Sequence, residues 1–154
     1  MACTKSVTYR HQSIIDFTKQ RAYFIDVVRN FKATTPLISV VDDDESVRES
    51  LPDLLRELGF EAEAFSSAEK FLASDYAGRT KCLILDITMP GMTGPELQME
   101  LAHRGNGIPI IFITAQRDET VRQQLIELGA VACLFKPFSE PALLEALNAA
   151  FRMG

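Results

Sequence analysis

Residues 82–95 read CLILDITMPGMTGP. The apolar run from Cys82 to Leu85, which ends at Asp86, is typical of a strand buried on both faces, as in a parallel sheet covered by helices. Pro95 is favoured in the first turn of a helix, and the glycines before it suit a loop that passes close to other atoms. The stretch therefore predicts a strand, a loop and a helix, with an aspartate at the carboxyl end of the strand.

The same alternation of short apolar runs and amphipathic segments continues on both sides. Strands are expected at 37–41, 60–65, 82–85, 110–113 and 132–135. Helices are expected at 45–58 and 67–74, from Pro95 through Leu101, from Asp118 or Glu119 through Val121, Leu125 and Leu128, and from Ser139 through Leu147. This order predicts an α/β fold with a doubly wound, five-stranded parallel sheet. In such sheets, ligands bind beyond the carboxyl ends of the strands.

Polar side chains stand at those carboxyl ends. Asp42 and Asp43 follow the first strand, and Asp86 follows the third. If these two strands are neighbours, the three carboxylates converge, and because like charges repel they must take up protons or bind a cation. Oxygen ligands favour a hard divalent ion such as Mg²⁺. The sequence therefore predicts a candidate cation site.

Thr114 ends the fourth strand and Lys136 the fifth, which adds a hydroxyl and a positive charge to the same rim. A cation and a lysine neutralise phosphoryl oxygens, and an aspartate can act as the nucleophile. Each feature alone has an ordinary structural explanation, such as a helix cap or a Lys-Pro turn. Their coincidence at one edge of one sheet favours a phosphoryl site.

Residues 36–152 resemble the receiver domain of bacterial two-component response regulators. The resemblance rests on VVDD at 40–43 with Arg48, LILDITMPGMTG at 83–94, ITA at 113–115, GA at 129–130 and FKPF at 135–138. It implies a flavodoxin-like receiver fold with strand order 2-1-3-4-5.

The resemblance also implies residue roles. Asp86 is the expected phosphoacceptor, which takes a phosphoryl group from the phosphohistidine of a sensor histidine kinase. Asp43, Asp86 and the backbone carbonyl of Thr88 are the expected Mg²⁺ ligands, and Asp42 is expected to act largely through water. Thr114 and Lys136 are expected to contact the phosphoryl oxygens.

Two features near Lys136 bear on the resemblance: one follows the receiver pattern and the other departs from it. The Lys136–Pro137 bond is expected to be cis. Receivers usually carry Tyr or Phe three residues before the lysine, where this chain has Cys133. This departure bears on the usual switch, which pairs a threonine with a moving aromatic ring, and not on phosphorylation itself. Pro52 is a second departure, which is expected to kink the first helix.

Residues 1–33 form a segment of different character. They carry six Lys or Arg against two Asp, whereas residues 34–154 carry ten Lys or Arg against nineteen Asp or Glu. Apolar residues at helical spacing, among them Ile14, Phe17, Phe24, Val28 and Phe31, predict an extra N-terminal amphipathic helix. Homodimerisation through this helix is favoured slightly over packing on its own receiver domain. A membrane-surface helix is a third, weaker alternative.

Other function classes find little support. No apolar stretch approaches the ~20 residues of a membrane helix, and the N-terminus lacks the apolar core of a signal peptide, so a cytoplasmic protein without membrane association is expected. Cys82 and Cys133 are expected to be buried thiols. The histidines, His11 and His103, are too scattered for a metal site, and the sequence contains no P-loop.

The expected function is a two-component response regulator that signals through protein contacts. The last predicted helix ends near the end of the chain, so neither an output domain nor direct DNA binding is expected. A histidine phosphotransfer protein or another regulator is the expected downstream partner. The alternatives are a phosphohydrolase of the haloacid-dehalogenase type and a pseudo-receiver. A phosphohydrolase of that type needs a second aspartate where Thr88 stands, so an enzyme is not expected. A pseudo-receiver would have lost some of the acidic residues Asp42, Asp43 and Asp86, all of which this chain keeps.

Overall fold

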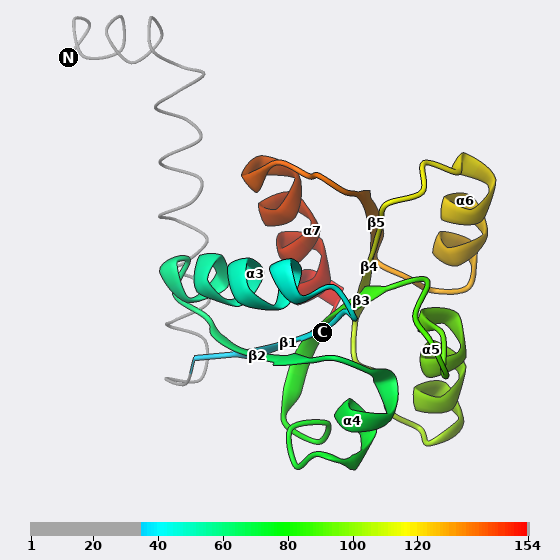
Figure 1. Cartoon of the computed structure of the whole chain (residues 1–154), viewed down its shortest axis with the longest axis horizontal. Coiled ribbons are helices and arrows are strands. Elements are labelled where there is room, and N and C mark those ends of the chain that lie inside the picture. The colour runs from blue at the N-terminus through cyan, green and yellow to red at the C-terminus, as the bar shows by residue number, and fades with distance from the viewer. Residues whose placement is uncertain (1–34, 154) are drawn as a thin grey trace, which may run out of the picture. The chain divides into compact units, whose positions relative to one another are not determined.

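The computed structural model describes residues 35–153 and contains one parallel sheet in the order β2-β1-β3-β4-β5 (Figure 1). Its strands are β1 Leu37–Val41, β2 Glu61–Phe65, β3 Thr80–Asp86, β4 Ile110–Thr114 and β5 Ala132–Phe135. The predicted doubly wound α/β fold and its strand order are confirmed. The helix predicted within residues 1–33, and the dimer expected from it, lie outside the described residues.

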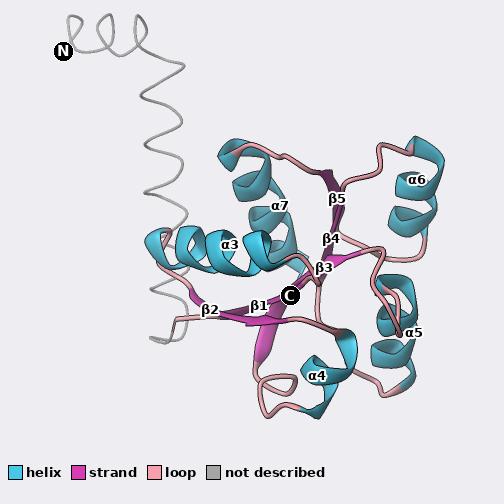
Figure 2. Ribbon diagram, in the orientation of Figure 1, coloured by secondary structure: helices cyan, strands magenta, loops and turns pink. Residues whose placement is uncertain are grey.

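Helices cover both faces of the sheet (Figure 1, Figure 2). They are α3 Glu45–Glu57, α4 Ala68–Ala73, α5 Gly94–His103, α6 Glu119–Glu127 and α7 Glu140–Met153. Figure 1 shows α3 and α7 on one face and α4, α5 and α6 on the other. None of these described helices combines the length and the apolar character needed to cross a membrane.

Short polar side chains fix where several helices begin. Asp44, Ser67 and Asp118 each accept a hydrogen bond from a backbone N–H in the first turn of the helix that follows. Thr93 and Glu96 exchange such bonds at the start of α5, which forms a capping box. Because the first N–H groups of a helix have no partner within the helix, these caps set its boundary.

Three details differ from the sequence prediction or extend it. β3 begins at Thr80, two residues earlier than expected, because Thr80 pairs with Leu37 of β1. Its buried hydroxyl also bonds both Ser39 Oγ and the Tyr76 carbonyl at 2.7 Å. Leu128, through which this helix was expected to run, is the C-cap of α6 and is 71% exposed. α3 continues through the buried Pro52 to Glu57, and the kink expected there stays a prediction.

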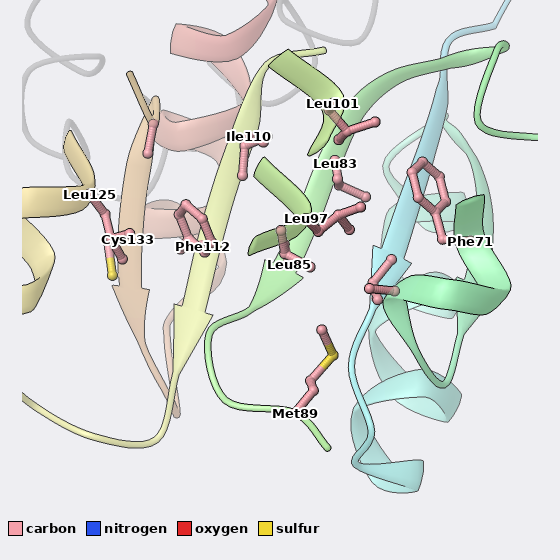
Figure 3. Packing of buried hydrophobic residues seen from close by; sticks show 13 residues of the cluster. Phe71, Leu83, Leu85, Met89, Leu97, Leu101, Ile110, Phe112, Leu125 and Cys133 are labelled. Carbon is pink, nitrogen blue, oxygen red and sulfur yellow. The ribbon is translucent and has the colours of Figure 1, made fainter. Parts of the chain in front are cut away.

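An apolar cluster lies between the sheet and helices α4, α5 and α6 (Figure 3). Phe71, Leu97 and Leu125 reach it from the three helices, and Leu85 and Phe112 reach it from the sheet. Full burial of such a side chain contributes about 1.5–3 kcal/mol. The cluster therefore fixes the sheet rigidly beneath the loops at its carboxyl edge.

Candidate functional site

Three carboxylates converge at the carboxyl ends of β1 and β3. Asp42 and Asp43 follow β1, Asp86 ends β3, and the two strands are paired directly. One oxygen from each carboxylate lies within 4.8 Å of one from each of the others. Asp42 and Asp86 are buried, whereas Asp43 is exposed. The structure thus brings together the three aspartates that the sequence singled out.

Asp42 is held from several sides. Lys136 Nζ donates to Asp42 Oδ2 at 2.6 Å, and the Asp44 N–H donates to Asp42 Oδ1 at 2.9 Å. Arg48 Nη1 donates to the Asp42 backbone carbonyl at 3.1 Å. A fully buried carboxylate is tolerated when it is paired and hydrogen-bonded in this way. Both Asp42 carboxylate oxygens are therefore engaged within the protein.

Lys136 connects the two buried carboxylates. The residue directly follows β5, and its Nζ lies 3.7 Å from Asp86 Oδ1. Burial favours the neutral amine, but the bond to Asp42 and the charge of Asp86 outweigh it and raise the pKa of Lys136. The lysine is therefore a fixed positive charge at the site. The peptide bond between Lys136 and Pro137 is cis.

The acidity of Asp86 is strongly perturbed by its surroundings. Burial and the negative charge of Asp42, together with the neighbouring Asp43, raise the pKa of Asp86 to about 7 against the opposing effect of Lys136. A cation beside the carboxylates would relieve this repulsion. The donors are all oxygens, so the residues fit a hard divalent ion such as Mg²⁺.

Thr114 and Thr88 border the carboxylates. Thr114 ends β4 beside β3 and is buried, and its Oγ1 accepts the Gln116 N–H at 3.1 Å, which orients the hydroxyl group. Thr88 lies in the exposed loop that follows β3. That loop is tied to β4 by the Ile87 N–H, which donates to the Ile113 carbonyl at 3.2 Å. The fold thus places both threonines at the edge that holds Asp86.

Cys133 lies in the apolar cluster beside Phe112, and burial raises the pKa of its thiol (Figure 3). Side chains two residues apart on a strand share a face, so the next residue on this face is Phe135. The guanidinium carbons of Arg117 and Arg122 lie 5.7 and 5.6 Å from the centre of its ring. Sequence reasoning missed this aromatic contact, although the period of two along the strand could have indicated it.

The raised pKa of Asp86 predicts how stability changes with pH in the absence of metal. Between about pH 4 and 7 the unfolded chain has lost this proton while the folded chain retains it, so the free energy of unfolding falls as pH rises. Asp86→Asn removes this dependence. Above pH 7 the variant is expected to be about 2 kcal/mol more stable than the wild type, after allowance for partial screening. Urea unfolding in EDTA from pH 5 to 8 measures the difference.

The control for this prediction is the same measurement in excess Mg²⁺, where the wild type is expected to gain more stability than Asp86→Asn. Parallel pH profiles for the two proteins in EDTA would contradict the prediction.

Comparison with known proteins identifies what this arrangement resembles. The sequence model of the response regulator receiver domain matches residues 38–148. Nodulation protein W of Bradyrhizobium diazoefficiens is 43% identical over 118 residues, which cover 77% of this chain and 52% of that protein. Response regulator protein TodT of Pseudomonas putida is 40% identical over 126 residues, which cover 82% of this chain and 56% of that protein. The chain therefore spans about half the length of these curated relatives.

Solved structures agree with the sequence comparison. The response regulator StyR gives a TM-score of 0.71 at 46% identity, over 78% of this chain and 61% of that one. The crystal structure of FixJ-N gives a TM-score of 0.69 at 35% identity, over 77% of this chain and 95% of that one. The resemblance drawn from the sequence motifs is confirmed.

Proposed function

Because the chain belongs to the response regulator receiver domain family, we propose that it accepts a phosphoryl group on Asp86 from the phosphohistidine of a sensor histidine kinase. The observation that carries the proposal is the placement of Asp86 beside two further carboxylates, with Lys136 Nζ 3.7 Å away. A carboxylate nucleophile, a metal site and a fixed positive charge are the parts that phosphoryl transfer needs.

The transfer step follows from these positions. An Asp86 oxygen attacks phosphorus, and the new O–P bond forms as the P–N bond to the donor histidine breaks. The electron pair of that bond returns to the imidazole nitrogen. Lys136 donates to a phosphoryl oxygen from its place between Asp42 and Asp86, and Thr114 offers its hydroxyl at the end of β4. Asp42 holds the lysine in position through the 2.6 Å contact.

Three groups would hold Mg²⁺: the carboxylates of Asp43 and Asp86 and the backbone carbonyl of Thr88. Asp42, whose oxygens are engaged with Lys136 and the Asp44 N–H, would act through water. The bound ion neutralises negative charge on the carboxylates and the phosphoryl oxygens. Asp86 would then be ionised at neutral pH, as a nucleophile must be.

Output is proposed to pass through protein contacts in the cytoplasm, to a histidine phosphotransfer protein or another regulator. Phosphorylation adds charge and acceptor oxygens at Asp86, which favours one of two receiver states. Cys133 is buried in the core and has no aromatic ring, so we do not propose that it acts as the usual aromatic switch.

Acetyl phosphate with Mg²⁺ tests the proposal on the full chain. We expect one phosphoryl group per chain, bound as an acyl phosphate that hydroxylamine removes, and no uptake in EDTA. A wild-type chain that takes up no phosphoryl group would contradict the proposal and indicate an interaction module. Rapid turnover of unrelated phosphate esters would instead indicate a phosphohydrolase.

The oligomeric state is a separate prediction. We expect the full chain to be a dimer in solution and a chain without residues 1–33 to be a monomer, because an amphipathic helix needs a partner for its apolar face. Sedimentation equilibrium or light scattering measures the mass of both. A monomeric full chain would contradict the dimer.

A further inference from the structure

We propose that Glu69, on α4, is a positioning residue that holds the loop between β3 and α5 in the shape required for Mg²⁺ binding. The inference rests on the proposed function, because this loop carries Thr88, whose backbone carbonyl is proposed as a metal ligand. Glu69 lies outside every motif that pointed to the site.

The contact joins two elements far apart in the chain. Glu69 Oε2 accepts the backbone N–H of Met92 at 3.0 Å, across 23 residues of sequence. A hydrogen bond to a charged acceptor is stronger than one between neutral groups. The contact therefore ties the middle of the loop to α4.

Gly91 provides a second observation at the same contact. Its φ of +74° is a conformation that favours glycine, and a Cβ placed there would lie 2.6 Å from Glu69 Oε2. A side chain at this position would push the carboxylate off the Met92 N–H. The loop thus has a glycine where the Glu69 carboxylate crosses it.

Other contacts hold the remaining parts of the loop. The Ile87 N–H donates to the Ile113 carbonyl, and the Gly94 N–H donates to the Ile87 carbonyl at 2.9 Å. The Met89 side chain turns from the loop toward the apolar cluster (Figure 3). These contacts fix the two ends of the loop and one side chain next to Thr88. Glu69 adds the constraint at Gly91 and Met92, so its loss should loosen the loop and misplace the Thr88 carbonyl.

Two substitutions separate the hydrogen bond from the charge. Glu69→Gln removes the charge but keeps an oxygen acceptor, whereas Glu69→Met removes both and keeps a similar length. The neighbouring Lys70 is also exposed on α4, and Lys70→Met is the matched control. Calorimetric titration of each full chain with Mg²⁺, without a phosphoryl donor, measures affinity. Hydrogen exchange at the Met92 amide measures the contact itself.

We expect Glu69→Met to weaken Mg²⁺ binding about two- to fivefold and to speed exchange at Met92 by a similar factor. Glu69→Gln keeps a weaker, neutral hydrogen bond and is expected to lie between the wild type and Glu69→Met, whereas Lys70→Met is expected to remain close to the wild type in both measurements. Gly91→Ala should weaken Mg²⁺ binding at least as much as Glu69→Met, because it strains the backbone at φ +74° and also displaces the carboxylate. Combining the two should add less than the sum of their separate effects on the free energy of Mg²⁺ binding, because both disrupt one contact.

Equal weakening in Glu69→Gln and Glu69→Met would overturn the inference, because it would show a long-range charge effect. Unchanged Mg²⁺ affinity in Glu69→Met would also overturn it. If the wild type takes up no phosphoryl group but the Mg²⁺ affinities of the variants differ from it as expected, the proposed function is contradicted and the role of Glu69 is supported. The two claims therefore fail separately.

Discussion

Asp86→Asn is expected to abolish acyl-phosphate formation from acetyl phosphate, from full labelling in the wild type to none. The amide is a weak nucleophile that cannot form the acyl phosphate, and the substitution also removes one of the three carboxylates that lie within 4.8 Å of one another. Because the variant lacks the repelling charge, it should still fold. Intact mass and hydroxylamine sensitivity of the label measure the result.

The matched control is Asp75→Asn, which changes an exposed aspartate in the loop after α4 and should label like the wild type. Asp43→Asn leaves the proposed nucleophile in place but removes a proposed metal ligand, so its label should form slowly and respond to higher Mg²⁺. A label that persists on Asp86→Asn would contradict the assignment of the acceptor.

The sheet and its acidic edge could be predicted because both depend on patterns within short segments. The run from Cys82 to Leu85 has no polar residue, as a strand between two layers of helices requires, and Asp86 ends it. In a parallel sheet the carboxyl ends share one edge, so pairing of β1 with β3 was sufficient to bring Asp42 and Asp43 to Asp86. Local pattern and topology together predicted the carboxylate cluster.

Contacts that side chains make across distant elements could not be predicted in this way. The Lys136–Asp42 ion pair spans 94 residues and the Glu69–Met92 bond spans 23, and neither produces a periodic pattern. Thr80 fell outside the strand expected at 82–85, because the Ser39 hydroxyl that pairs with its hydroxyl inside the sheet lies on another strand. Such contacts depend on packing, which a single sequence does not encode residue by residue.

Gly94→Ala is expected to have the largest effect on stability. Gly94 begins α5 directly beneath the end of β3, and its N–H donates to the Ile87 carbonyl at 2.9 Å. An added Cβ would overlap the Asp86 backbone oxygen and lie 3.0 Å from Phe112 Cε1 and 3.1 Å from Ile87 Cα. Backbone atoms and a core ring cannot swing aside, so we expect a loss of about 3 kcal/mol in the free energy of unfolding.

Because the expected loss of stability comes from steric overlap at Gly94, an alanine at a glycine with open space around it serves as the control. At Gly78 an added Cβ would meet nothing within 4 Å, so Gly78→Ala is the control and should change stability by less than ~1 kcal/mol. Urea unfolding of both variants measures the difference, and equal stabilities would contradict the prediction. The overlap falls on the backbone oxygen of Asp86 itself, so α5 and the proposed phosphoacceptor cannot both keep their places. Any Gly94→Ala chain that remains folded should therefore also form the acyl phosphate more slowly than the wild type.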